Sequence, residues 1–333
     1  MKIRTFALLS AIFLLFCGCS EPEEYRDTVF FAMDTYITVR LAQDGVTEEY
    51  LTKVSDECER LVTELEGILS AHDPDSELYK LNASDEECAE ISDTLKAVLV
   101  SAYDIAEQTN GAYDFTLGGL AELWNVTGGG PVPAQSDIDE ALAHAGYDSI
   151  TIGETRNTVM RSDTDVQIDL GGIGKGAAAD VLVRYLETTD VRYGLVSVGG
   201  TIGVFGDKPG GEAYKIGIRD PDDPNDILGY LHIRGGFVAV SGDYERYFEE
   251  NGVRYHHIFD PADGYPADNG LHEAAVYCET SGAAADALST ALFVMGTDAA
   301  MDLYVNAGGF EAVFVADDVV DTTDGADVEL LKP

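Results

Sequence analysis

A glycine-rich segment lies in the middle of this 333-residue chain, between a predicted strand and a predicted helix. The segment spans Asp169–Asp180 and holds four glycines at Gly171, Gly172, Gly174 and Gly176. Such glycines let a ligand approach the backbone, and free amides at a helix N-terminus suit a phosphate or pyrophosphate. Lys175 is followed by glycine, so this is not a Walker loop, and the spacing is not that of a dinucleotide-binding βαβ unit. A turn tightened only for packing is the alternative.

Short predicted strands outnumber helices around this segment. Apolar residues recur at helical spacing over Thr47–Leu69 and Ile91–Thr109, and shorter helices are expected over Asp137–His144 and Ala283–Met295. The expected strands are Val29–Leu41, Ser149–Ile152, Thr158–Arg161, Val166–Ile168, Gly194–Val198, Ile202–Phe205, Ala213–Ile218, Gly229–Ile233, Phe237–Ser241, Val253–Phe259 and Ala274–Cys278. Because short turns join many of them, we expect an α+β fold with antiparallel or mixed sheets in one large domain.

The N-terminus predicts export. Lys2 and Arg4 precede an apolar run over Phe6–Phe16, which is shorter than the roughly 20 residues that a membrane-spanning helix needs. The run ends at a small residue before Cys19, an arrangement that resembles a bacterial lipoprotein signal. We therefore expect a signal peptide over residues 1–18, a lipidated tether over 19–27, and a domain over 28–333 anchored on the extracytoplasmic face of the cell membrane. An ordinary signal peptide or an uncleaved anchor is the alternative.

The net charge of −41 excludes nucleic acid as a partner, because so acidic a surface repels phosphate backbones. An acidic protein that binds a phosphorylated ligand must offset the ligand's charge locally, with a cation or a helix N-terminus. Beyond the N-terminal pair, the cysteines are Cys58, Cys88 and Cys278, without the spacing of a zinc site. A Cys58–Cys88 disulfide remains open.

A second polar motif lies in the last predicted helix. Asp286 and Thr290 are four residues apart and therefore face the same side of the helix. Their carboxylate and hydroxyl, completed by backbone carbonyls and water, form an all-oxygen set suited to Mg²⁺. The alternative is that Asp286 lies near the helix start and Thr290 merely packs, without binding a metal.

A third motif lies at the end of the predicted strand Val253–Phe259. His257 and Asp260 lie near a sheet edge there, and an imidazole or a carboxylate in this position is suited to act as a general base. A histidine that only satisfies a core hydrogen bond is the alternative.

Taken together and in order, these motifs closely resemble the ApbE-type FAD:protein FMN transferase family. The resemblance extends from Met33 to about Gly296, and its elements are Met33–Thr35, Asp73–Leu81, Gly111–Leu120 with Leu123 and Trp124, Asp169–Asp180, Val198–Gly200, Gly217–Pro221, Ser241–Phe248, His257–Pro266 and Asp286–Thr290. The resemblance implies a T-fold-like architecture and Mg²⁺-dependent cleavage of FAD.

The resemblance also implies site residues. FAD would be lined by Met33, His72, Ala112, Tyr113, Asp114, Asp169, Lys175 and Ile258. The metal would be held by the carbonyl of Gly172 and by Asp286 and Thr290, with Ser289 nearby. The sequence departs from the family pattern at His72, where tyrosine is common, at Asp34, where glycine is usual, and at Ser289, where some members have a carboxylate.

The glycine-rich segment, the metal ligands and the base each have a role in the expected reaction. The FAD pyrophosphate would lie across Gly171–Gly176, with Mg²⁺ neutralising its oxygens. A threonine or serine hydroxyl of an exported client protein, expected to be a redox subunit, would attack the phosphorus on the riboflavin side and expel AMP. His257 is the candidate base, and Asp260 or Asp169 are alternatives. The competing functions are an FAD-binding lipoprotein, an FAD pyrophosphatase that yields FMN and AMP, and an extracellular solute-binding protein.

Overall fold

The computed structural model describes residues 25–221, 223, 226–316 and 319–331. The predicted signal peptide, Cys19 and most of the predicted tether lie outside these residues. None of the helices in this part of the chain combines the length and apolar character needed to cross a membrane.

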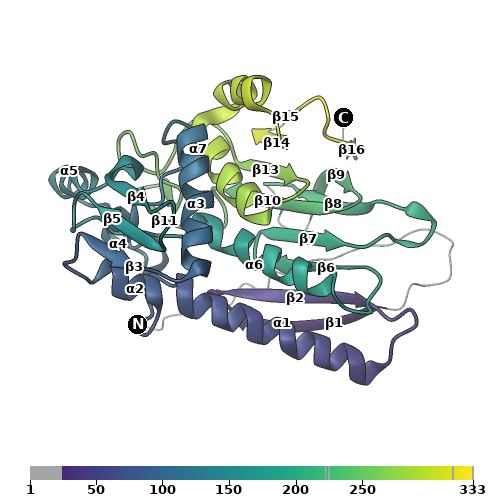
Figure 1. Ribbon diagram of the computed structural model, residues 1–333. Helices are drawn as coiled ribbons and strands as arrows, with labels where there is room; N and C mark the ends of the chain where they lie inside the picture. Colours follow the sequence, from purple (N-terminus) through teal and green to yellow (C-terminus); the bar gives the residue numbers. More distant parts are fainter. Residues whose placement is uncertain (1–24, 222, 224–225, 317–318, 332–333) are drawn as a thin grey trace, which may run out of the picture.

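An eight-stranded sheet forms the centre of the molecule (Figure 1), and each of its strands pairs antiparallel with its neighbours. The strands in spatial order are β1 (Tyr25–Ala32), β2 (Thr35–Ala42), β6 (Gly194–Val198), β7 (Thr201–Phe205), β10 (Gly236–Gly242), β13 (Glu273–Cys278), β14 (Glu311–Ala316) and β15 (Val319–Thr322). The sheet is built from distant parts of the sequence: β1 and β2 of the first half form one edge, and β2 pairs with β6 of the second half.

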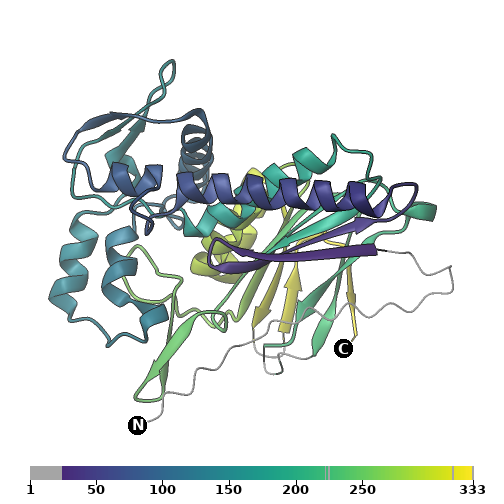
Figure 2. The same cartoon turned by 90° about the horizontal axis from the view of Figure 1, so that it is seen from below.

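Long helices cover one face of this sheet, and a smaller sheet packs on the other (Figure 2). The helices are α1 (Glu48–Leu69), α3 (Asp93–Gln108), α6 (Gly171–Leu186) and α7 (Gly282–Ala307). The smaller sheet is β16-β9-β8, with β8 at Tyr214–Arg219, β9 at Ile227–Ile233 and β16 at Val328–Leu330. Its apolar residues, such as Ile216 and Leu231, pack against Val204 and Val238 of the central sheet.

A lobe of short elements extends beyond one end of the sheet (Figure 1). It contains α2 (Glu77–Asn82), α4 (Gly118–Trp124), α5 (Gln135–Ala143), a sheet of β3 (Cys88–Glu90), β5 (Thr158–Arg161) and β4 (Ile150–Ile152), and the hairpin of β11 (Tyr247–Glu250) with β12 (Val253–His256). Trp124 is fully buried at the centre of a separate apolar cluster with Phe259, and its indole N–H donates to the carbonyl of Gly264 at 2.8 Å.

The α+β fold class with several sheets is confirmed, as are the helices over Thr47–Leu69 and Ile91–Thr109. Each of these helices begins after a hydroxyl N-cap, Thr47 and Ser92, whose side chain accepts an amide of the first turn. The helix expected over Ala283–Met295 continues to Ala307 in α7, but the backbone leaves helical geometry at Gly296. The predicted end therefore coincides with a kink.

Two strand predictions are wrong in part, and a third is wrong. Val29–Leu41 is not one strand but a hairpin, because Met33 and Asp34 adopt φ of 51° and 55° and turn the chain. Since β1 begins at Tyr25, the last residues assigned to the tether belong to the domain. The strand over Val253–Phe259 ends at His256, after which Phe259 forms only an isolated bridge.

Val166–Ile168 is also not a strand, although it is buried. The side-chain amide of Asn82 replaces a neighbouring strand: its Nδ2 donates to the carbonyl of Ile168 at 2.8 Å, and its Oδ1 accepts the Ile168 N–H at 3.0 Å. Both backbone groups of Ile168 are thereby satisfied without a ladder. The disulfide between Cys58 and Cys88 is absent too, since Cys58 is buried in α1 and Cys88 is exposed, each as a free thiol.

Candidate active site

The crossing of α6 and α7 brings the two polar motifs together. A Cβ built on Gly176 would lie 2.1 Å from the carbonyl oxygen of Gly282, so only glycine permits this approach. Asp180 of α6 fixes the start of α7, because its carboxylate accepts the N–H groups of Gly282 at 2.7 Å and Ala283 at 3.0 Å. One turn further, Asp286 of α7 faces the glycine-rich turn of α6.

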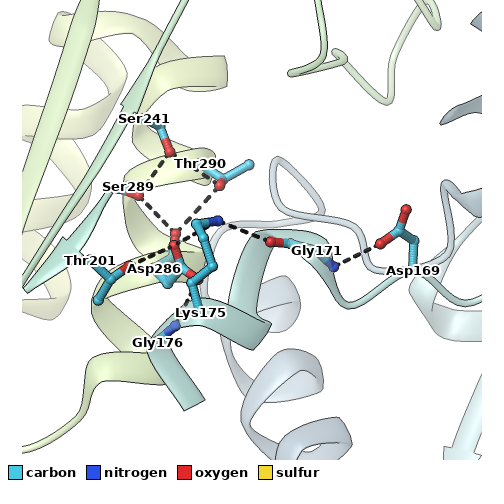
Figure 3. A network of polar contacts seen from close by, with 9 residues as sticks. All are labelled: Asp169, Gly171, Lys175, Gly176, Thr201, Ser241, Asp286, Ser289 and Thr290. Carbon is cyan, nitrogen blue, oxygen red and sulfur yellow. Dashed lines mark hydrogen bonds and ion pairs between the residues drawn. The ribbon is translucent and has the colours of Figure 1, made fainter. Parts of the chain in front are cut away.

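The carboxylate of Asp286 is the centre of the site (Figure 3) and is only 2% exposed. Its Oδ2 accepts the N–H of Gly176 at 2.9 Å, and its Oδ1 accepts the hydroxyl of Thr201 at 3.2 Å. The ammonium of Lys175 lies 3.5 Å from the same Oδ1. These donors and the nearby cation offset the cost of burying the carboxylate. Thr201 was not predicted, because nothing in the sequence links it to Asp286.

Hydroxyl groups surround the first turn that follows Asp286 (Figure 3). Ser289, fully buried, donates to the Asp286 carbonyl at 2.8 Å and lies 2.8 Å from the hydroxyl of Ser241 on β10. The Thr290 hydroxyl is 3.3 Å from Ser241 and would be 3.5 Å from a Cβ on Gly172. The structure therefore brings Gly172, Asp286 and Thr290 together, as expected of the predicted metal ligands, while Ser289 directs its hydroxyl toward β10.

Lys175 supplies the positive charge of the site. Its Nζ donates to the carbonyl of Gly171 at 3.2 Å, and its side chain passes close to Gly199, whose Cβ position would be 3.1 Å from the lysine Cδ. In this arrangement, the ammonium neutralises part of the charge of Asp286. It also stands at the start of α6, where the helix dipole attracts an anion.

The phenol of Tyr113 is an orphaned polar group at this site. Tyr113 is 3% exposed, and its hydroxyl has no hydrogen-bond partner among the described residues. Burial raises its pKa well above the ordinary value, and the charges of Asp286, Asp169 and Asp114 add to that increase. Its ring edge lies 3.1 Å from the Cβ position of Gly172. An unsatisfied buried hydroxyl beside carboxylates and a carbonyl fits a site that is completed by a bound polar group or cation.

Two predicted FAD carboxylates hold the loops around the site. Asp169 accepts the N–H of Gly171 at 2.7 Å and so shapes the glycine-rich turn. Asp114, whose pKa is raised by burial, accepts the N–H and hydroxyl of Thr116 and the N–H of Tyr147 at 3.0 Å. Ala112, in the loop before Asp114, is partly buried against the main core.

The hairpin turn of β1 and β2 forms another wall. Met33 adopts an unusual left-handed conformation, and its N–H donates to Glu66 Oε1 at 2.9 Å. Its methyl group lies 3.4 Å from the Cβ position of Gly174, so it covers the glycine-rich turn. A non-glycine residue held at positive φ indicates that the surrounding structure fixes it there. The predicted position of Met33 at the site is consistent with this contact.

The two neighbouring histidines have different roles. His256 is buried, and its Nε2 lies 2.9 Å from the Ala267 carbonyl while its Nδ1 accepts the N–H of Ile258 at 3.2 Å, so it is structural. In His257, Nδ1 lies 3.2 Å from the carbonyl of Arg246. Because a carbonyl can only accept, Nδ1 carries the proton and Nε2 has a free lone pair. Burial lowers the pKa of His257 to about 3, assisted by the positive charges of Lys175 and Arg246.

Ile258, 5% exposed, is part of the main core next to these histidines. Asp260 and His72 were also predicted to belong to the site. Among the described residues, no hydrogen bond or ion pair joins either of them to it. Asp260 accepts the N–H of Ala262 at 2.8 Å and stabilises a surface turn, and His72 is exposed in the loop after α1. Their predicted roles stay predictions without geometric support.

The chain is similar to known flavin transferases over most of its length. Residues 33–314 match the ApbE family model. An FAD:protein FMN transferase from Vibrio cholerae is 32% identical over 309 residues, which cover 90% of each chain. One from Treponema pallidum is 34% identical over 275 residues, covering 78% of this chain and 75% of the relative. The crystal structure of the ApbE protein from Thermotoga maritima superimposes with a TM-score of 0.83 at 32% identity, covering 90% of this chain and 97% of that one. For the flavin transferase ApbE from Vibrio cholerae, the TM-score is 0.79 at 28% identity, with 92% and 97% covered.

Proposed function

The chain belongs to the ApbE family and is an FAD:protein FMN transferase, and we propose that it joins FMN to a threonine or serine hydroxyl of its client, with a divalent cation at Asp286. The observation that carries this proposal is the buried carboxylate of Asp286, held against the glycine-rich start of α6 and beside Lys175. A cation at Asp286 would lie next to an anion at the start of α6, as cleavage of a pyrophosphate requires.

Three oxygen donors would hold the cation: the carboxylate of Asp286, the hydroxyl of Thr290 and the carbonyl of Gly172. All are hard ligands, so the set fits Mg²⁺ rather than a thiophilic metal. When bound, such an ion neutralises charge on the phosphate oxygens and makes the phosphorus more electrophilic. Because Lys175 now neutralises Asp286, we expect its flexible side chain to turn toward the FAD phosphates when the cation binds.

The residues of the chain position the two reactants. The positive end of the α6 dipole and the ammonium of Lys175 attract the pyrophosphate, and Met33 covers the turn on which it lies. The client hydroxyl attacks the phosphorus on the riboflavin side, and the bond from that phosphorus to the AMP oxygen breaks. The free lone pair of His257 Nε2 accepts the hydroxyl proton, while its Nδ1–H remains bonded to Arg246.

The bound phosphates are also expected to change the pKa of His257. The pKa of His257 is low in part because Lys175 and Arg246 are nearby. An anionic pyrophosphate offsets these charges, so FAD binding should raise the pKa of His257 toward the range where it accepts a proton efficiently.

The test is to incubate the purified protein with FAD and Mg²⁺, with and without an exported redox domain that has an acceptor threonine. Mass spectrometry then measures FMN on the domain and AMP in solution. Mg²⁺-dependent modification of the domain with equal release of AMP supports the proposal. Release of free FMN and AMP whether or not the domain is present would indicate a hydrolase, and tight FAD binding without AMP would indicate a binding protein.

We also propose that Cys19 is lipidated and anchors the enzyme to the extracytoplasmic face of the cell membrane. The support is the signal layout alone, with a basic start, a short apolar run and a small residue before Cys19. Cys19→Ser should move the protein from the membrane fraction to the soluble exported fraction. A variant that stays in the membrane fraction and retains the lipid mass would contradict this assignment.

A further inference from the structure

An exposed aromatic pair lies on the hairpin of β1 and β2. Phe31 and Tyr36 are directly opposite each other in the register, with ring centroids 5.4 Å apart at an angle of 74°. Each is 62% exposed, and Val29, two residues earlier on the same face of β1, is 58% exposed. The other face of β1 is buried, as Phe30 shows at 8%. We call Val29, Phe31 and Tyr36 the hairpin patch.

The pairing of the rings does not explain their exposure. Cross-strand aromatic contacts stabilise hairpins, but here more than half of each side chain remains in contact with solvent. The pair is also already ordered, since both residues lie on paired strands. Rigid aromatic groups that are exposed in advance bind a partner with little loss of conformational freedom.

The turn next to the hairpin patch borders the active site. The turn between Phe31 and Tyr36 holds Met33, which covers the glycine-rich turn. The carbonyl of Asp34 in that turn accepts a 3.5 Å hydrogen bond from Arg246, and the carbonyl of Arg246 in turn holds His257. The turn next to the patch is therefore joined to the proposed base through Arg246.

β1 is also an edge strand. It is first in the order of the eight-stranded sheet and pairs only with β2 among the described residues (Figure 2). An edge strand offers backbone groups to which an extended segment of another protein can add. An exposed apolar face beside such an edge is a typical protein-binding surface.

We propose that the hairpin patch is the docking surface for the client protein, and that it binds an extended, apolar segment adjoining the acceptor hydroxyl. This inference rests on the proposed function, in which a protein must bring its hydroxyl to His257. The client fits better than a second copy of this chain, because the patch adjoins the site at which the reaction itself requires a protein partner. Specificity for the client then comes from the hairpin, while the FAD chemistry comes from α6 and α7.

The experiment compares variants that keep β propensity. F31T/Y36T removes both rings, and Val29→Thr removes one apolar side chain. The matched control is Val319→Thr, the same substitution at 55% exposure on β15, the opposite edge of the sheet. Binding of the acceptor domain is measured by interferometry, FMN transfer by steady-state kinetics, and FAD affinity by flavin fluorescence.

We expect F31T/Y36T to raise both KM and Kd for the domain at least tenfold and Val29→Thr to raise them a fewfold. The kcat and the affinity for FAD should remain within twofold of wild type, and Val319→Thr should behave as wild type. Because Val29→Thr is a mild change at the surface, it tests the proposal even if the double variant does not fold.

Three results would overturn the proposal: domain binding within twofold of wild type in F31T/Y36T, a loss of FAD affinity equal to the loss of domain binding, or a change only in oligomeric state. The last would identify a second copy as the occupant. If wild type binds the domain through the patch but never transfers FMN, docking is supported and the proposed reaction chemistry is wrong.

Discussion

The clearest test of the site is to replace Asp286 in two ways, by alanine and by asparagine. Asp286→Ala removes the acceptor of two buried donors, the N–H of Gly176 and the hydroxyl of Thr201. Asp286→Asn keeps the side-chain volume and one carbonyl oxygen for Gly176, and the Thr201 hydroxyl can rotate to accept from the new amide. The two variants therefore separate the structural role of Asp286 from its charge.

The structure sets the size of each effect. Each buried donor left unsatisfied costs about 1–3 kcal/mol, so Asp286→Ala should lower the free energy of unfolding by about 2–6 kcal/mol. Lys175 adds little, because its side chain is 26% exposed and can turn to solvent. Asp286→Asn should cost about 1–2 kcal/mol, since its bonds become neutral. Both variants should lose FMN transfer by about 10²-fold or more, because the cation loses its only proposed carboxylate.

Urea unfolding measures stability, calorimetry measures Mg²⁺ binding, and mass spectrometry measures FMN transfer. We expect the asparagine variant to fold, to lose Mg²⁺ binding and to lose most of its FMN transfer. An asparagine variant with wild-type, Mg²⁺-dependent transfer would refute the assignment of Asp286 to the metal. An alanine variant as stable as wild type would refute the reasoning about the two donors.

Three further predictions concern the base, a buried acid and the helix crossing. His257→Gln should lower kcat about 10²–10⁴-fold with FAD affinity retained. Because the pKa of His257 is about 3 in the fold and about 6.5 unfolded, wild type should lose stability relative to this variant as pH falls from about 6.5 toward 4. Burial raises the pKa of Glu273 to about 7, so the stability linked to its protonation is present below about pH 4.5 and is lost as pH rises through 7. Glu273→Gln should therefore gain stability over wild type at pH 8, and equal pH dependence of the two in urea unfolding would contradict this. Gly176→Ala should cost more than about 3 kcal/mol because its Cβ would overlap Gly282, whereas Gly67→Ala, in open space on α1, should gain about 0.5–1 kcal/mol.

Much of the local structure was predictable from residue patterns. Helical spacing predicted α1 and α3, and the spacing of Asp286 and Thr290 placed them on one helix face, as the structure shows. The glycines of Asp169–Asp180 predicted a close approach to the backbone, and the approach observed at Gly176 is that of another helix.

The failed predictions share a physical cause. A hairpin was taken for one strand because Met33 and Asp34 lack the glycine or asparagine that usually marks such a turn. The segment before the glycine-rich turn has the composition of a strand, but Asn82, 86 residues away, satisfies Ile168 in place of a neighbouring strand. In both cases a tertiary contact or an unusual backbone conformation overrode local preference.

The sequence by itself determined the family, the α+β class and the identity of the polar motifs, because these depend on residue types and on spacing within single elements. Only the tertiary structure decided which of those residues meet. Asp286 bonds Gly176 at a separation of 110 residues and Thr201 at 85. The tautomer of His257 depends on Arg246, and its low pKa depends on burial and on the charges of Lys175 and Arg246. Periodicity fixes the face of a helix on which a side chain lies, but the partner on that face is set by how the helices and the sheet pack together.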